Sequence, residues 1–271
     1  ASCIHSGLTF TGEVTCQAED AALVKSALAG IKWVGTMRSR GFGRVRVRGI
    51  EAKAEPAAPE TGTASCICYR LRTETPVVIT DLDRSQENSY ETRGYIPGSA
   101  VRGMVISTLA SRYPDWFQKN RAALLSEDTR FLNAVPVVDA GAPIPAIKGF
   151  YEDKGETVFE TVVRAGTFTA GLKRAKLGAF CALDGDTVCC WSAATSGTTR
   201  ISLNTASGEN MAIFQSAGIC AGQELEGYIL LENPDLANEI ARALSDAVWL
   251  GADRYEGFGK CSVTNCRAVE R

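Results

Sequence analysis

The chain has 271 residues, 45% of them hydrophobic, which is enough for one large or two medium domains with a sizeable core. Its formal net charge of −2 excludes a protein that attracts nucleic acid through its overall field, so any such affinity must come from local basic patches. We see no signal peptide and no apolar run of bilayer length, and we therefore expect a cytoplasmic protein without a membrane partner.

The ten cysteines do not have the spacing of a metal site. They occur as Cys66-x-Cys68, as Cys189-Cys190 and as single residues, without a Cys-x-x-Cys pair, and His5 is the only histidine. A chain of this size does not need disulfides in order to fold. We expect buried free thiols and no metal bound at the cysteines.

The N-terminal part of the chain predicts a strand over 8–16, a helix over 18–29 and a second strand after a glycine-rich loop. That loop and strand, residues 35–48 (GTMRSRGFGRVRVR), resemble residues 251–263 (GADRYEGFGKCSV) near the C-terminus. Two copies indicate an internal repeat, in which each copy is a strand, a helix, a glycine loop and a further strand.

The first glycine loop combines backbone freedom with positive charge. Gly41 and Gly43 permit positive φ and leave no Cβ between a ligand and the backbone amides. Arg38 and Arg40 lie beside these amides in sequence, and arginine grips phosphates in a bidentate manner. The alternative interpretation, a tight helix-to-strand turn, stays open because Gly-x-Gly loops are common.

The strand after this loop carries arginine at every second position. Arg44, Arg46 and Arg48 therefore share one face of an extended strand, and we expect the valines between them to face the core. A row of guanidinium groups beside an open loop suits a phosphate backbone. The other possibility is a solvated charged strand face.

Two structural parts are expected on either side of a linker. Residues 51–64 (EAKAEPAAPETGTA) have no apolar periodicity, which is typical of a linker. Residues 1–50 hold only the second half of a βαββαβ module, whereas 65–271 are enough for a complete module with insertions. The pattern predicts an α+β fold of ferredoxin-like modules, one copy partial and one complete.

The complete module begins with a strand over 66–80 that Pro76 breaks. A polar loop over 81–93 follows, and it carries the carboxylates Asp81 and Asp83. The alternative to a functional role for these two residues is a polar loop with solvated acids.

A second candidate phosphate site lies at the start of the next predicted helix. We expect Ser99 to be the N-cap of this helix and Pro114 to end it. Backbone amides at a helix start bind anions, so Gly98, Ser99 and the nearby Arg102 are the candidate residues.

The remaining segments show weaker patterns up to the second glycine loop. A basic cluster at 173–176 has a solvated face as its favoured interpretation, and residues 195–208 (TSGTTRISLNTASG) predict a hairpin or a flexible loop. A strand is expected over 224–231, followed by a helix that Asn233 caps.

The second glycine loop is less basic than the first. Asp253 and Glu256 interrupt its charge, and only Arg254 and Lys260 are basic. The first loop is therefore the better candidate for contact with nucleic acid, and Arg254 and Lys260 are weaker candidates.

Three motifs resemble the RAMP superfamily of CRISPR-associated proteins. These are residues 91–103 (ETRGYIPGSAVRG), the pair of glycine-rich loops, and residues 205–227. Glu256 departs from the superfamily pattern, in which a small or basic residue is usual. Within the superfamily, the chain is most similar to type III subunits of subtype D, and the extra half-module suggests a fused, multi-repeat effector protein.

The resemblance implies a subunit that holds guide RNA (crRNA) by its backbone, so that the bases pair with target RNA, together with other CRISPR effector subunits. No aromatic run of the RRM type is visible, which agrees with backbone holding. The alternative is a protein-only assembly module.

The resemblance leaves the question of an enzyme open. Some RAMP subunits cut target RNA with an aspartate after the first strand, where Asp81 and Asp83 lie, and a divalent ion such as Mg²⁺ would then be the cofactor. A non-catalytic RNA-binding scaffold is the favoured interpretation, with no cofactor and no resident metal.

Overall fold

The fold was analysed in a computed structural model, which describes residues 4–14, 16–35, 38–52, 63–83, 85, 89–138, 143–146, 149–152, 159–161, 173–175, 179–184, 187–202, 212–245 and 247–269. The chain forms two compact units, Ala1–Glu55 and Pro56–Arg271. The boundary falls within the segment that was predicted to be a linker.

The first unit contains one helix and one glycine loop. Its elements are the 3₁₀ turn η1 (Ala18–Asp20), helix α1 (Ala21–Ala29) and the 3₁₀ turn η2 (Arg38–Arg40). The predicted helix is therefore confirmed.

The two strands predicted in this unit are not formed over its described residues. The described part of 8–16 has no ladder partner there, and the second strand is reduced to a single bridge between Trp33 and Arg44. Val45 is 38% exposed, so the expected core position is also wrong. The physical reason is that a strand needs a neighbouring strand for its backbone groups, and the described part of this unit provides none.

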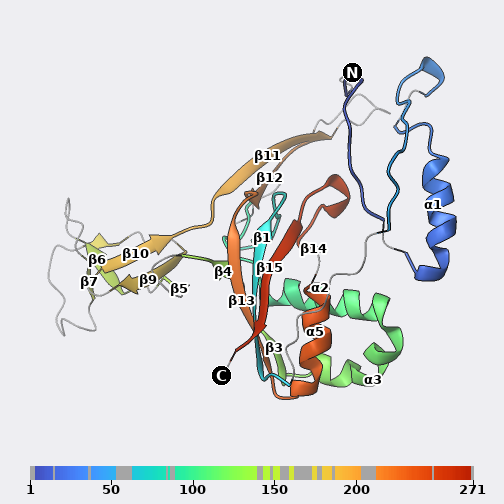
Figure 1. The fold of residues 1–271 in the computed structure, drawn as a ribbon. Coiled ribbons are helices and arrows are strands. Elements are labelled where there is room, and N and C mark those ends of the chain that lie inside the picture. Colours follow the sequence, from blue (N-terminus) through green and yellow to red (C-terminus); the bar gives the residue numbers. More distant parts are fainter. Residues whose placement is uncertain are drawn as a thin grey trace. The chain divides into compact units, whose positions relative to one another are not determined.

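The second unit is built on a six-stranded antiparallel sheet (Figure 1). Its strands, in spatial order, are β14 (Val248–Trp249), β15 (Lys260–Ala268), β1 (Cys66–Thr73), β13 (Glu224–Leu231) and β3 (Thr129–Phe131), with β4 (Val135–Pro136) also paired to β13. The predicted strand at 224–231 is confirmed. The central pair β1–β13 runs from Cys66 opposite Leu230 to Arg72 opposite Glu224.

Alternation of side chains explains which face of this sheet is buried. In β13 the residues Leu225, Gly227, Ile229 and Leu231 are buried, and the intervening residues are half-buried. Gly227 is required at its position, because a Cβ there would collide with the Tyr69 ring of β1. The absence of that Cβ lets a fully buried tyrosine sit at the centre of the core.

Helices cover the apolar face of the sheet (Figure 1). They are α2 (Gly98–Arg112), α3 (Pro114–Leu125), η3 (Pro234–Leu236) and α5 (Ala237–Ala243), with the turn η4 (Arg254–Glu256) in the second glycine loop. The chain does leave α2 before Pro114, and this proline then takes the first position of α3, where its missing N–H costs nothing. Asn233 caps η3 as expected, since its Oδ1 accepts a hydrogen bond from the Asp235 amide at 3.2 Å.

Three smaller three-stranded sheets complete this unit. The first consists of the hairpin β11 (Thr195–Ser202) and β12 (Ala212–Ile219), with β2 (Ser89–Tyr90) parallel to β12. The second joins β5 (Ile144–Pro145), β9 (Phe180–Asp184) and β10 (Thr187–Trp191). The third joins β6 (Phe150–Glu152), β7 (Phe159–Thr161) and β8 (Lys173–Arg174). The predicted hairpin is present, although residues 203–211 lie outside the described part. The architecture is thus α+β with mainly antiparallel sheets.

The described cysteines carry free thiols, and four of them, Cys66, Cys68, Cys181 and Cys261, are buried. Burial raises the pKa of the Cys261 thiol to about 12, which keeps it protonated and unreactive. Over the described residues, no group of three or more histidine, cysteine, aspartate or glutamate side chains could hold a metal ion. None of the described helices is long and apolar enough to cross a membrane.

Candidate nucleic-acid interface

The first glycine loop presents its basic side chains on the surface of the first unit. Gly41 and Gly43 both have positive φ, of 82° and 77°. The loop is closed by the Val34 amide, which donates to the Gly43 carbonyl at 2.9 Å, and a Cβ at Gly43 would collide with the Val34 backbone. The sequence needs glycine here because two backbone segments approach closely.

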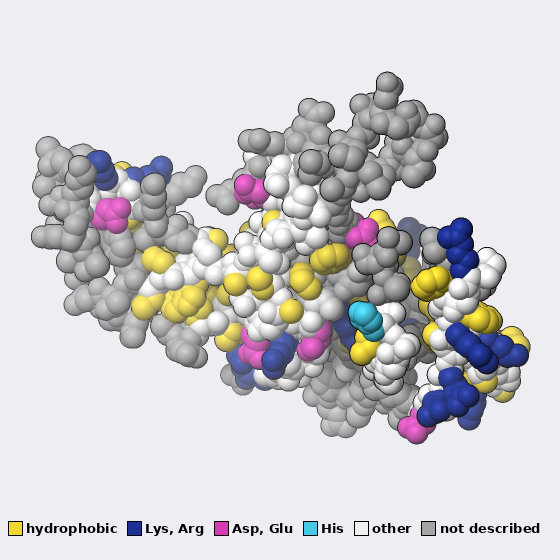
Figure 2. Space-filling model, turned by 90° about the horizontal axis from the view of Figure 1, so that it is seen from above, with side chains coloured by type: hydrophobic (Ala, Val, Ile, Leu, Met, Phe, Trp, Pro, Cys, Tyr) yellow, Lys and Arg dark blue, Asp and Glu magenta, His cyan; other side chains and the backbone are white. Residues whose placement is uncertain are grey.

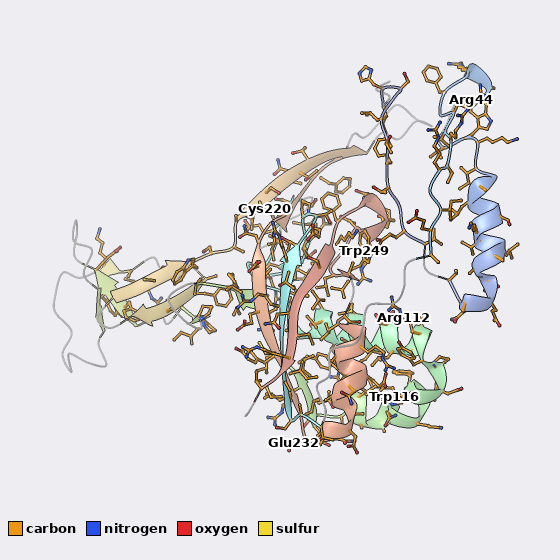
Figure 3. The ribbon with its side chains drawn as sticks, in the orientation of Figure 1. Arg44, Arg112, Trp116, Cys220, Glu232 and Trp249 are labelled. Carbon is orange, nitrogen blue, oxygen red and sulfur yellow. The ribbon has the colours of Figure 1, made fainter. Side chains whose placement is uncertain are left out.

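The arginines around this loop are exposed where their side chains are described, namely Arg40, Arg44, Arg46 and Arg48. The side chain of Arg38 lies outside the description, although its backbone begins the turn η2. Dark-blue side chains gather at the right-hand end of Figure 2, and Figure 3 labels Arg44 at the end of the loop. Exposed arginines at neighbouring positions of the chain create a local positive field that a net charge of −2 does not reveal.

The second glycine loop has the same backbone form as the first. Gly251, Gly257 and Gly259 have φ of 82°, 89° and 87°, and the Leu250 amide donates to the Gly259 carbonyl at 2.8 Å. Trp249, which Figure 3 labels beside this loop, pairs with Lys260 as Trp33 pairs with Arg44. The two glycine loops therefore share one backbone conformation, whereas the flanking strands of the predicted repeat are formed only in the second unit, over the described residues.

Charge distinguishes the two loops. Arg254 is exposed, but its Nε donates to the Gly251 carbonyl at 3.1 Å, so part of its hydrogen-bonding capacity serves the loop itself. Lys260 is half-buried at the start of β15. Asp253 adopts a left-handed conformation with φ of 58° and adds a carboxylate to the turn.

The start of α2 differs from the expectation. The helix begins at Gly98 with Pro97 at the N-cap position, so Ser99 is an exposed residue of the first turn and not the cap. The Gly98 amide donates to Oδ1 of Asn133 at 2.9 Å. An asparagine distant in sequence therefore occupies an amide that was predicted to be open for an anion.

Arg102 is turned toward α3. Its Nη2 donates to the Leu124 carbonyl at 3.2 Å, at the C-terminal end of that helix. A cation there satisfies a carbonyl that has no partner within its own helix. The three residues Gly98, Ser99 and Arg102 remain candidate RNA contacts, and Ser99 is the most exposed of them.

The two candidate acids are placed differently. Asp81 is held by Arg93, with 3.6 Å between Oδ1 and Nε, and its side chain is only 17% exposed. Asp83 lies on the exposed turn that follows. A hydrogen bond to the Tyr95 hydroxyl at 3.1 Å, with Asp81 nearby, raises the pKa of Arg93, so this guanidinium stays charged.

A charged network on the β1–β13 pair was missed by sequence reasoning. Arg70 donates to Oε2 of Glu226 at 2.9 Å, and the Tyr228 hydroxyl donates to Oε1 of the same carboxylate at 2.9 Å. Burial alone would raise the pKa of Glu226, but these two hydrogen bonds lower it. In the sequence, β1 has arginines at positions 70 and 72 and β13 has glutamates at positions 224 and 226. Only the strand register shows that Arg70 lies opposite Glu226 and Arg72 opposite Glu224.

Comparison with known proteins gives matches of structure alone. No protein-family model and no curated protein matches the chain. Its structural neighbours include Cmr4 (Cas7) from Pyrococcus furiosus and chains of type III-B Cmr-beta and type IV-B CRISPR complexes. Sequence identities are near the level of unrelated chains, so the proposals below rest on this chain's own residues.

Three of these neighbours illustrate the extent of the likeness. The apo state of the type III-B Cmr-beta complex has 12% identity and a TM-score of 0.47, covering 74% of this chain and 97% of that chain. The Cmr-beta complex bound to cognate target RNA has 13% identity and a TM-score of 0.45, covering 76% of this chain and 60% of that chain. Oligomeric Cmr4 from Pyrococcus furiosus has 13% identity and a TM-score of 0.39, covering 76% and 99%.

Proposed function

We propose that this chain is a guide-RNA-binding subunit of a type III CRISPR effector complex, similar to subtype D, and that it holds crRNA by its phosphate backbone. The observation that carries the proposal is the first glycine loop, where two positive-φ glycines and a set of exposed arginines lie together. Phosphates bind such a surface without regard to base sequence. The CRISPR context rests on the RAMP-like motifs of the sequence.

We further propose that the second unit is a complete ferredoxin-like, RRM-like module and that residues 1–50 are part of another copy. The order β15-β1-β13-β3, with helices α2 and α3 between β1 and β3 and helix α5 between β13 and β15, supports the first statement. The shared conformation of the two glycine loops supports the second. A cytoplasmic location follows from the proposed role in a CRISPR effector complex.

The first test is to purify the protein with its native partners at moderate salt and to sequence any nucleic acid that it retains. We expect guide RNAs of uniform length that each begin with a repeat-derived tag. A stably assembled complex without RNA would contradict the proposal and favour a protein-only assembly module.

The second test removes charge from the loop. We expect Arg38→Ala combined with Arg40→Ala to weaken the binding of single-stranded RNA. The slope of log K against log salt should become less steep by about 1.4, because about 0.7 counterion is released for each phosphate contact of a single strand and two contacts are lost. A matched control is Lys119→Ala with Arg121→Ala, which removes the same charge from exposed positions of α3. Equal losses in both variants would mean that the loop has no special role.

A second candidate function is cleavage of target RNA. It is favoured by the position of Asp81 and Asp83 directly after Thr80, in a loop that faces solvent at Asp83. If the assembled complex cleaves target RNA in the presence of Mg²⁺, then alanine at both positions should abolish cleavage and leave guide-RNA content unchanged. Unchanged cleavage would remove these two residues from consideration and leave the scaffold function in place.

A further inference from the structure

A cleft of about 310 Å³ opens on the second unit, among segments far apart in the sequence. Its walls come from the segment before the acidic loop, from β2, from β12 and from the second glycine loop. The lining residues are Val78, Thr80, Tyr90, Phe214, Ser216, Ala252 and Asp253.

The register of the strands explains why two aromatic residues meet there. In the parallel pair β2–β12, Tyr90 lies opposite Ser216. Phe214 is two residues before Ser216, so its side chain is on the same face of β12. The Tyr90 and Phe214 rings are therefore diagonal neighbours on one face of the sheet.

The floor of the cleft depends on a glycine of the same strand. Gly218 continues the face that carries Phe214 and Ser216, and a Cβ at Gly218 would lie 3.4 Å from Cγ2 of Val78 and 3.3 Å from the Val77 carbonyl. Val77 pairs with Ile219 of β12 through backbone hydrogen bonds of 2.9 and 2.8 Å, and the missing side chain of Gly218 leaves room for the Val77–Val78 segment beside this strand. The Ala252 amide then donates to the Val78 carbonyl at 2.9 Å and ties the second glycine loop to this floor.

The chemistry of the lining suits a flat, unsaturated ring with polar edges. Val78 and Ala252 make an apolar floor, and the ring of Tyr90 is 42% exposed. Thr80 and Ser216 add hydroxyl groups, which both donate and accept hydrogen bonds. None of the described lining residues is a lysine or an arginine, and Asp253 adds a carboxylate, so this described lining does not select a phosphate.

An arginine nevertheless lies next to the cleft lining along the chain. Arg254 follows Asp253 directly and is exposed. Its Nε donates to the Gly251 carbonyl at 3.1 Å, so the guanidinium belongs to the same glycine loop that supplies Ala252 and Asp253 to the cleft. An aliphatic or aromatic protein side chain would leave the hydroxyl groups and this arginine without a role.

We propose that this cleft binds one unpaired nucleobase of an RNA strand, stacked on Tyr90 or Phe214. The proposal rests on the RNA-binding function proposed above and adds a base-binding subsite to a surface that otherwise contacts phosphates. Stacking on aromatic rings tolerates any base, so the subsite anchors the strand without reading its sequence.

The test compares two probes, a short single-stranded oligoadenylate and an abasic ribose phosphate oligomer of the same length, with the full chain. We expect the wild-type protein to bind the oligoadenylate more tightly by about tenfold, since each stacked base contributes binding free energy that the abasic probe lacks. Tyr90→Leu combined with Phe214→Leu keeps apolar volume and removes both rings, and it should abolish this preference.

Two further variants make the result specific. Tyr255→Leu removes an aromatic ring that is 88% exposed in the same glycine loop but does not line the cleft, and it should retain the tenfold preference. Ala252→Leu fills the cleft with a non-aromatic side chain, and it should abolish the preference even if the double leucine variant does not fold.

The outcomes separate the two proposals. A wild-type protein that binds neither probe contradicts the RNA-binding function as a whole. Equal affinity for both probes, or loss of preference only in Tyr255→Leu, overturns the base-binding cleft and leaves phosphate binding intact. Cleft variants that alter subunit assembly but not base preference would assign the cleft to a protein partner and would also overturn the proposal.

Discussion

At the scale of single residues, the glycine loops depend on positions that no other residue fits. Gly259 combines a φ of 87° with a site where a Cβ would collide with the Leu250 carbonyl. A residue with a Cβ at this position would therefore destabilise the fold, both by backbone strain and by the loss of this close approach. The same two conditions hold at Gly43, where the colliding group is the Val34 carbonyl.

We predict that Gly259→Ala lowers the free energy of unfolding by about 2 kcal/mol, measured by urea denaturation. The control is Gly103→Ala, because Gly103 lies in the exposed part of α2 with open space around its Cα. That substitution should raise the free energy of unfolding by up to about 1 kcal/mol, as alanine is the better helix former. Equal effects of the two substitutions would contradict the role assigned to Gly259.

At the scale of secondary-structure elements, the pair β1–β13 is held by more than its backbone ladder. The Arg70 guanidinium and the Tyr228 hydroxyl both bind the Glu226 carboxylate, and the Glu226 side chain is 22% exposed. A carboxylate whose pKa is lowered on folding stabilises the native state above its unfolded pKa, and this contribution is lost as the pH falls through the folded value.

We predict that Glu226→Gln lowers the free energy of unfolding by about 1 kcal/mol at neutral pH. The difference between wild type and variant should begin to shrink below about pH 4, where the carboxyl of the unfolded chain takes up a proton, and should vanish once the pH falls through the lowered pKa of the folded carboxyl. Glu232→Gln is the matched control, since its ion pair with Arg130 is half exposed and should contribute less. A difference that stays constant from neutral to acid pH would exclude the ionised carboxylate as the cause.

At the scale of the whole molecule, the two units differ in how much they bury. None of the described residues of the first unit is buried, whereas the core of the second unit includes fully buried residues from β1, β13, α2 and α5. Local stability follows the number of buried apolar contacts, so the first unit should open far more readily than the second.

We therefore predict that amides of α1 exchange with solvent close to the rate of an unprotected peptide in the isolated chain, while those of α2 are strongly protected. Hydrogen exchange read by mass spectrometry measures both helices in one experiment. Comparable protection of α1 and α2 would contradict this reading of the first unit. If guide RNA binds the first loop, adding RNA should slow exchange there and leave α2 unchanged.

Local patterns were sufficient for part of the fold and of the site. The β13 strand, the Asn233 cap, helix 18–29 and the repeated glycine loops all follow from periodicity, capping chemistry and turn chemistry. Each of these signals depends on residues within a few positions of one another. The basic character of the first loop is likewise visible in the chain itself.

Tertiary structure alone decided the remaining features, because they join residues distant in sequence. Strand register brings Glu226 to Arg70 and Tyr90 to Phe214, and a register shift of one residue would turn these side chains to the opposite face. Asn133 takes the Gly98 amide that local reasoning left open, and Arg93 takes Asp81. The strands expected in the first unit failed for the same reason, since a segment becomes a strand only where a neighbouring strand accepts its backbone hydrogen bonds.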